Sequence, residues 1–334
     1  MNNSEEIIQK YHSLHNENEQ TDTIPVISLD GMQHKLGVSV EGYPKYFVHS
    51  DGSTTSIQNI IREILSVEYN VPCDLKDDSG VRQKDTFSII TLRTKEKSLQ
   101  NYFIEIFYMM LQKLPSEPSM RELSIEVESL ITIFSALTKP PKKKIQGLWA
   151  ELLVIEQSKH PEVLINAWHQ PASAKYDFTM GRDKIEVKST SGENRIHHFS
   201  LDQLNPSKNS RLVVSSIMVR ESAKTTDGLS VKDLYEKIIA KVSTVHSRLH
   251  LYTIIADTIG TDFLKLEKVF YDYTSAIDSL AFYDALLIPR IIKDDVPESV
   301  HDVSFSSDLT NVEDIRSMQQ SNDFSDSILF SELF

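Results

Sequence analysis

Several features that identify common protein classes are missing from this sequence of 334 residues. It contains a single cysteine, Cys73, so no disulfide can form within the chain, which is typical of a reducing cytoplasm. No run of apolar residues is long enough to span a bilayer. The first twenty residues are polar and partly acidic, unlike a secretory signal. These absences predict a cytoplasmic protein without a membrane segment.

Widespread chemical motifs and positive charge are also lacking. The chain has no HExxH, paired CxxC, Walker loop or dinucleotide fingerprint, so zinc proteases, zinc fingers, nucleoside triphosphatases and dehydrogenases have no support. Only 35 Lys and Arg residues face 48 Asp and Glu residues, which gives a formal net charge of −13. This balance argues against a protein that binds nucleic acid nonspecifically through a uniformly basic surface.

The negative charge is unevenly distributed, however. Residues 139–211 hold 12 Lys and Arg against 8 Asp and Glu, a local net charge of +4. A locally basic region is compatible with binding a phosphate backbone at one place. Ordinary fluctuation of surface charge along the chain is an equally weighted alternative. From residue 302 onward, 7 acidic residues face one basic residue, Arg316.

Periodicity and turn residues predict a chain that mixes α and β structure. Pro140 and Pro141 cannot continue a helix, so we place a domain boundary there. We expect an N-terminal α+β accessory domain at 1–138, a catalytic domain with a helical extension at 139–300, and an acidic tail at 301–334. The predicted helices cover 1–23, 56–65, 99–114, 119–137, 146–158, 200–204, 231–242, 251–259 and 263–282. The predicted strands lie within 34–49, 67–71, 86–93, 163–168, 176–188 and 212–219, with a further strand or helix end at 285–292.

The most informative stretch is YDFTMGRDKIEVK, residues 176–188. Apolar and polar residues alternate at its end, which indicates a half-buried strand, and the Gly-Arg-Asp in its middle predicts a hairpin turn. Side chains alternate between the faces of a strand, so Glu186 and Lys188 point the same way. Asp177 reaches the same edge if the two segments pair. Two carboxylates and an ammonium would then surround a site suited to a hard cation such as Mg²⁺.

A helix before this hairpin supplies a further acid. In GLWAELLVIE, the apolar residues recur at helical spacing, and Glu151 falls within their stripe. A carboxylate on an apolar face needs a cation or a hydrogen-bond donor. The alternative is a partly exposed glutamate at the edge of the stripe.

The order of helix, three strands, helix and strand is αβββαβ, and together with these residues it resembles the PD-(D/E)XK superfamily of restriction-endonuclease-like nucleases. The segments GLWAELLVIE, AWHQP, YDF, EVKST and FSLDQL more closely resemble a bacterial family named "PD-(D/E)XK motif protein", which is associated with restriction and phage defence. Tyr176 stands where the superfamily often has proline. The substrate does not follow from a shared fold.

This resemblance implies a magnesium-dependent endodeoxyribonuclease, with Mn²⁺ as a substitute ion. Asp177 and Glu186 would bind the ion, Glu151 would supply a further ligand directly or through water, and Lys188 would position or activate the attacking water. Gln203 would hydrogen-bond a phosphate or a water, although an amide that packs a helix is the alternative. The implied partners are DNA, a second copy of the chain for cutting both strands, and other defence proteins.

Other polar groups and other functions remain as alternatives. We expect His197 and His198 on a solvated loop, with contact to a leaving group or phosphate as the alternative. We expect Lys142, Lys143 and Lys144 in a charged linker, with steering of DNA as the alternative. A nuclease-fold subunit that binds DNA or assembles a defence complex with little activity of its own is the first rival function. A structural interaction protein with a coincidental motif is the second, and metal binding would exclude it.

Overall fold

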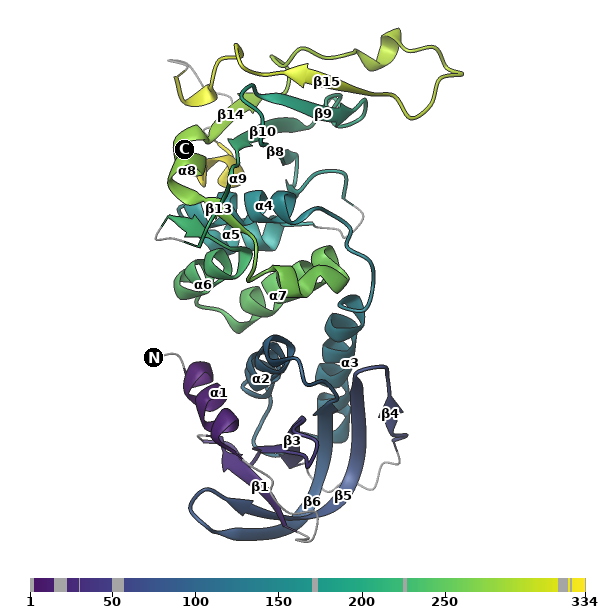
Figure 1. Cartoon of the computed structure of the whole chain (residues 1–334). Coiled ribbons are helices and arrows are strands. Elements are labelled where there is room, and N and C mark those ends of the chain that lie inside the picture. Colours follow the sequence, from purple (N-terminus) through teal and green to yellow (C-terminus); the bar gives the residue numbers. More distant parts are fainter. Residues whose placement is uncertain are drawn as a thin grey trace. The chain divides into compact units, whose positions relative to one another are not determined.

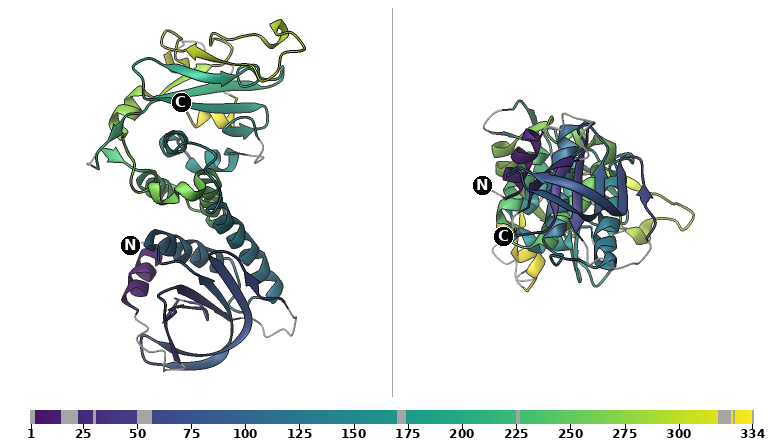
Figure 2. Two further views of the ribbon diagram at one scale, coloured as in Figure 1. Left: turned by 45° about the vertical axis from the view of Figure 1, so that its right-hand side comes forward. Right: turned by 90° about the horizontal axis from the view of Figure 1, so that it is seen from below.

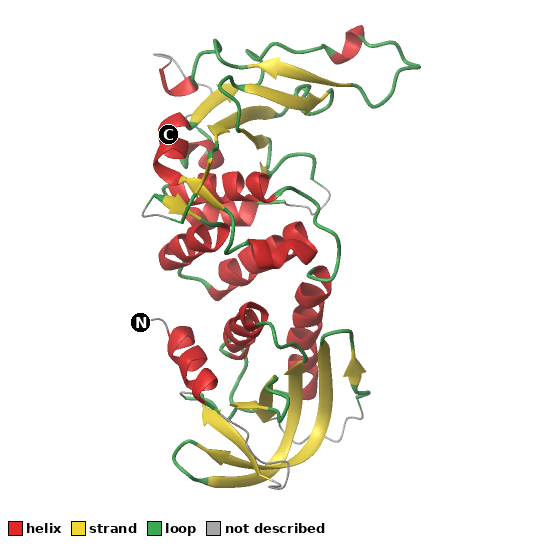
Figure 3. Ribbon diagram, viewed as in Figure 1, coloured by secondary structure: helices red, strands yellow, loops and turns green. Residues whose placement is uncertain are grey.

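The structure is a computed structural model that describes residues 3–14, 23–29, 31–49, 57–169, 174–224, 227–317, 324 and 326–333. The chain divides into two compact units, Met1–Thr138 and Lys139–Phe334. Each unit contains helices and hydrogen-bonded strands, and each sheet stays within its unit (Figure 3). The predicted mixed α/β class is confirmed. Among the helices of the described residues, none combines the length and the apolar character needed to cross a membrane.

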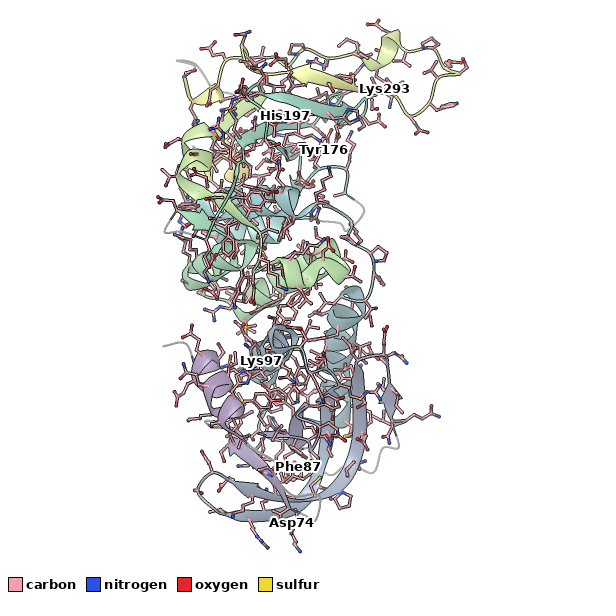
Figure 4. All side chains as sticks on the ribbon, in the orientation of Figure 1. Asp74, Phe87, Lys97, Tyr176, His197 and Lys293 are labelled. Carbon is pink, nitrogen blue, oxygen red and sulfur yellow. The ribbon has the colours of Figure 1, made fainter. Side chains whose placement is uncertain are left out.

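The first unit is built around a six-stranded sheet in the order β1-β2-β3-β6-β5-β4. An additional parallel pairing of β1 with β5 closes five of these strands into a ring, which is visible as the curled sheet in Figure 2. Phe87, labelled in Figure 4, belongs to a buried cluster on these strands. The elements are α1 (Asn3–Ser13), β1 (Thr23–Ser28), β2 (Lys35–Val38), β3 (Pro44–His49), β4 (Ile60–Ile61), β5 (Leu65–Asp77), β6 (Arg82–Leu92), α2 (Lys97–Leu111) and α3 (Met120–Ala136).

Strong local sequence patterns correctly predicted helices of this unit. Helix α2 is buried along most of its length, as its nearly continuous apolar sequence indicates. Helix α3 begins with the predicted capping box between Ser119 and Glu122. The helix predicted at 56–65 is wrong, because the described residues from 57 onward contain β4, whose isoleucines favour extended backbone. The turn expected at Asp51-Gly52 and residues 15–22 lie outside the described residues.

The second unit contains a four-stranded sheet in the order β14-β10-β8-β7, in which β8 and β10 run parallel. Two smaller sheets, β11-β13-β12 and β15-β9, accompany it. The elements are α4 (Ile145–Gln157), α5 (Pro161–Ala167), β7 (Phe178–Met180), β8 (Asp183–Thr190), β9 (Ile196–Ser200), β10 (Arg211–Met218), β11 (Glu221–Ser222), β12 (Gly228–Leu229), α6 (Val231–Lys241), α7 (Val245–Ile259), β13 (Phe270–Asp272), α8 (Tyr273–Ser279), β14 (Ala281–Asp284), β15 (Ser304–Asp308), α9 (Ile328–Ser331) and the 3₁₀ turns η1 (Gly260–Lys265), η2 (Lys293–Asp295) and η3 (Ile315–Ser317).

The four-stranded sheet lies between two layers (Figure 1). Helix α4 packs against β8 and α6 on one face. The β9–β15 pair covers the other face, where Phe199 of β9 joins a buried cluster with Val214 of β10 and Tyr176. In the parallel register Val214 lies beside Glu186, so the side chain of Glu186 is on the face that β9 covers. Tyr176 and His197 are labelled on this side in Figure 4.

Several predicted elements of this unit have a different structure. The strand predicted at 163–168 is wrong, because Pro161 starts helix α5 with its fixed φ at the first helical position. The helix predicted at 200–204 is a turn. The long helix predicted at 263–282 is broken into η1, β13, α8 and β14, since its aromatic segments pair with neighbouring strands. The segment 285–292 is a turn followed by irregular chain.

Described residues after position 300 are integrated into the second unit. Strand β15 pairs antiparallel with β9, and Leu309 enters the same buried cluster as Phe199. Ser327 donates a hydrogen bond to the carboxylate of Asp183 at 2.6 Å, and Asp326 pairs with Arg211. The sequence signal of an acidic tail therefore describes the charge of this segment and misses its packing.

Candidate active site

Glu151 lies in the middle of α4 with its side chain 3% exposed. Its Oε2 atom accepts a hydrogen bond from Trp168 Nε1 at 2.7 Å and pairs with His169 Nε2 at 3.1 Å. Its Oε1 atom accepts from the ammonium of Lys143 at 2.6 Å. Both oxygens are paired, as a buried carboxylate requires.

Asp177 comes directly before β7, and its side chain is 8% exposed. Its Oδ2 atom accepts from the backbone N–H of Val187 at 2.8 Å, which ties it across the hairpin to β8. Its Oδ1 atom accepts from Lys143 Nζ at 2.6 Å. One ammonium therefore bridges the carboxylates of Asp177 and Glu151.

These groups have the composition of a cation site. Among the described residues, Glu151, His169 and Asp177 each offer a ligand atom, and these atoms lie within 4.8 Å of one another. The carboxylate oxygens are ligands that Mg²⁺ and Mn²⁺ favour. The ammonium of Lys143 already stands in the position of a cation that contacts both acids. The residues fit a divalent ion held chiefly by Glu151 and Asp177.

A second group of polar side chains lies on the face of the sheet that β9 covers. Lys188 Nζ is 2.9 Å from Glu186 Oε1 and donates to Gln203 Oε1 at 3.2 Å. Gln203 Nε2 donates to Glu186 Oε1 at 2.6 Å, so the amide joins the acid and the lysine. Lys188 Nζ also lies 5.0 Å from the centre of the Phe199 ring. Glu186 and Lys188 share this face as strand alternation predicts.

Burial and mutual repulsion shift the acid equilibria of these carboxyl groups. Burial, and then the charge of Asp177, raise the pKa of Glu186 to about 8. Burial and the charge of Glu151 raise the pKa of Asp177. Burial alone would raise the pKa of Glu151, but the hydrogen bond with His169 and the charge of Lys143 bring it below its ordinary value. The charge of Asp177, in the first group, therefore acts on Glu186, in the second group.

Comparison with protein-family models assigns the chain to a family. A family model described as "Putative PD-(D/E)XK family member, (DUF4420)" matches residues 7–310. The chain belongs to this family. The match covers most of both units, and it confirms the superfamily resemblance that the motifs of the second unit indicate. No curated protein and no solved structure matches the chain.

The residues that carry the PD-(D/E)XK pattern in this family member fall into the two groups described above. Asp177 and Glu151 meet at Lys143, whereas Glu186, Lys188 and Gln203 form the neighbouring group. Glu186 is outside the set of ligand atoms that lie within 4.8 Å of one another. The charge of Asp177 raises the pKa of Glu186. The role of each of these residues in the reaction stays a prediction.

Two residues of this site were not predicted. Lys143 was assigned to a linker or to DNA steering, and its side chain instead contacts two acids. His169 is part of the AWHQP motif, and its backbone N–H donates to the carbonyl of Asp177 at 2.8 Å. The φ angle of His169 is +47°, in the left-handed region that non-glycine residues rarely adopt. Strained backbone of this kind concentrates at functional sites. The AWHQP motif was the sequence signal that could have identified His169 as a site residue.

The two histidines expected on a loop lie on strand β9. His197 is buried, its Nε2 atom is 2.7 Å from Ser216 Oγ, and burial followed by the charge of Lys188 lowers its pKa to about 4. His198 is exposed on the same strand. The loop prediction is wrong, because the pairing of β9 with the distant β15 is not visible in the local sequence.

The segment that carries Lys143 is fixed to the end of α7. The backbone N–H of Lys142 donates to Thr258 O at 2.9 Å, and that of Thr261 donates to Lys139 O at 2.8 Å. Gly260 permits this close approach: its φ is +49°, and a Cβ there would lie 2.1 Å from the carbonyl oxygen of Lys139. The segment is anchored chain and not a loose linker.

Gly260→Ala is expected to destabilise the protein by on the order of 3 kcal/mol, because it adds both a strained φ and a clash with backbone. Chemical denaturation of the metal-free chain measures this free energy of unfolding. Gly147→Ala is the matched control, since Gly147 lies in α4 and a Cβ there meets nothing within 4 Å. It should leave stability unchanged or raise it by up to about 1 kcal/mol. Equal effects of the two changes would contradict the anchoring.

Proposed function

We propose that this chain is a divalent-metal-dependent endonuclease that hydrolyses phosphodiester bonds in DNA. The observation that carries the proposal is the shared cation position. There the ammonium of Lys143 lies 2.6 Å from one carboxylate oxygen of Glu151 and 2.6 Å from one of Asp177. A buried pair of acids around a cation, next to a Glu-x-Lys strand, is suited to hydrolysis of a phosphate ester. Membership of a family described by the PD-(D/E)XK pattern supports the same reaction.

In this mechanism Glu151 and Asp177, whose oxygens now contact Lys143, would hold the ion. A bound divalent ion would polarise the scissile phosphate and make a water more acidic. Trp168 and His169 hold Glu151 in its orientation, and the Val187 N–H does the same for Asp177. These contacts fix the ligand oxygens before substrate arrives, which is the preorganisation that catalysis needs.

Lys188 and Gln203 act on the other side of the site. The ammonium of Lys188 orients the attacking water or neutralises charge that develops on the phosphate. Gln203 is a positioning residue, since its amide holds both Lys188 and Glu186. Glu186, with a pKa of about 8, exchanges a proton near neutral pH, and in its ionised form it would be a further ligand for the ion.

The biological setting of the proposal rests on the sequence resemblance. We assign the chain to bacterial restriction or anti-phage defence, with double-stranded DNA as substrate. Cutting both strands needs two sites, which a homodimer would supply. The unit Met1–Thr138 would recognise DNA, form the dimer or dock a defence protein.

Asp177→Asn is expected to abolish cleavage of plasmid and phage DNA in Mg²⁺ or Mn²⁺, and to remove the metal-induced rise in melting temperature. The amide keeps the size of the side chain and an acceptor for Val187 N–H, but it loses the charge that binds the ion. Agarose-gel cleavage assays and thermal shift with each metal measure both effects. Asp202→Asn is the matched control, because Asp202 precedes Gln203 and its exposed side chain pairs with Lys293 at the surface.

The proposal fails if the wild-type chain shows neither metal-dependent stabilisation nor cleavage, with and without candidate partner proteins. The function would then be that of a nuclease-fold subunit that binds DNA or assembles a defence complex. The net charge of −13 favours that second candidate, because a strongly acidic chain alone is attracted weakly to a phosphate backbone. Metal binding without cleavage by the isolated chain, followed by cleavage with a partner, would support a nuclease that is activated in a complex.

A further inference from the structure

Lys143 occupies the centre of the candidate cation site. Its ammonium lies 2.6 Å from Glu151 Oε1 and 2.6 Å from Asp177 Oδ1. These carboxylates are 3% and 8% exposed, and two buried negative charges without a cation between them would repel one another strongly. The lysine therefore stabilises the metal-free arrangement.

The other two carboxylate oxygens already have donors in the protein. Glu151 Oε2 is held by Trp168 and His169, and Asp177 Oδ2 is held by the Val187 N–H. Lys143 contacts the other oxygen of each carboxylate, so its ammonium fills the position between Glu151 and Asp177 where a metal ion would contact both acids. An ammonium and a divalent ion cannot both sit between one pair of oxygens, so their binding is mutually exclusive.

The backbone is held in place on both sides of Lys143. Before it, Lys142 is anchored to the backbone of Thr258, and after it Lys144 is the N-cap residue of α4. The side chain of Lys143 is nonetheless 36% exposed, which gives it a path to solvent. A lysine has a flexible four-carbon stem, so the ammonium can leave while the backbone stays fixed.

We propose that Lys143 is an internal competitor of the metal: its ammonium closes the site in the metal-free chain, and a divalent ion must expel it in order to bind. This inference rests on the proposed metal dependence of the site and adds a contact that inhibits the enzyme until the ion is abundant. Lys143 thus sets the metal concentration at which the site becomes competent.

The test is calorimetric titration of Mn²⁺ into the full-length wild-type chain and three variants. Lys143→Gln should bind Mn²⁺ at least tenfold more tightly than the wild type, and its metal-free form should melt at a lower temperature. Lys143→Arg retains the charge and should bind no more tightly than the wild type. Lys144→Gln is the matched control, since it removes the same charge from an exposed neighbour and should leave the affinity unchanged.

A labelling experiment on the wild-type chain supplies a readout that needs no variant to fold. Acetic anhydride should modify Lys143 slowly without metal and several-fold faster with saturating Mn²⁺, as mass spectrometry measures it. Lys144 in the same samples should not change. An unaltered rate at Lys143 under saturating Mn²⁺ would overturn the proposal.

The possible failures are distinguishable. If wild-type chain binds Mn²⁺ and Lys143→Gln binds it equally or more weakly, the competitor role is wrong while the metal-dependent function stands. If Lys144→Gln tightens binding as much as Lys143→Gln, the effect is one of overall charge and the role is also wrong. If neither wild type nor Lys143→Gln binds Mn²⁺, the metal-dependent function itself fails, and this inference fails with it.

Discussion

Lys188→Ala is expected to slow DNA cleavage by about 10²–10³-fold while leaving Mn²⁺ affinity nearly unchanged. Lys188 contacts Glu186 and Gln203 but neither of the two acids that meet at the cation position. We therefore expect its loss to remove the charge proposed to act on water or phosphate and to leave the proposed ligands of the ion in place. Single-turnover cleavage and calorimetry on the same preparation separate the two effects.

Lys184→Ala is the control for this change. Lys184 lies four residues before Lys188 on β8, on the same face of the strand, and its ammonium donates to the carbonyl of Gly181. Its removal alters the net charge equally and should leave cleavage within about twofold. If Lys188→Ala cuts DNA at the wild-type rate, Lys188 has no part in the chemistry.

Glu186→Gln is expected to stabilise the metal-free protein at alkaline pH by between about 1 and 5 kcal/mol. The pKa of Glu186 rises on folding from 4.5 to about 8, because the group is buried and faces Asp177. A raised pKa means that its contribution to stability is fully present below pH 4.5 and is lost as the pH rises through about 8. At 1.36 kcal/mol per pKa unit, this interval sets the upper figure.

Urea denaturation at intervals from pH 5 to pH 9 measures this effect. The difference in free energy of unfolding between Glu186→Gln and wild type should grow across the range and level off above pH 8. Glu193→Gln changes an exposed residue on the loop after β8 and should differ from wild type by no more than about 0.5 kcal/mol at every pH. A constant difference for Glu186→Gln would show that Glu186 does not hold a proton in the fold.

Elements with a strong local signal were predicted from the sequence. Alternation identified β8, a nearly continuous apolar run identified α2, and a capping box placed the start of α3. Weak local patterns gave the errors. The segment now seen as α5 is too short for periodicity to separate a helix from a strand, and β9 pairs with β15 more than a hundred residues later.

In the candidate site, too, local sequence patterns predicted some residues and missed others. Glu151 is visible as an acid within an apolar helical stripe, and Glu186 with Lys188 as two polar residues on one strand face. Lys143 and His169 belong to no helical or strand repeat in the sequence, because only tertiary contacts bring them to the site. Lys143 meets Asp177 across 34 positions of sequence, and an anchor at Gly260 holds its segment. One lysine among three in succession has no distinguishing mark until the fold brings the acids beside it.

Crystals of the wild-type chain grown with Mn²⁺ and a short DNA duplex would show whether a metal ion binds at this site. We expect an anomalous-scattering peak between Glu151 Oε1 and Asp177 Oδ1, with the ammonium of Lys143 moved out of that position. The duplex phosphate should lie on the same side as Lys188. An absent peak at saturating Mn²⁺, with Lys143 still bridging the two carboxylates, would contradict a metal-dependent nuclease at this site.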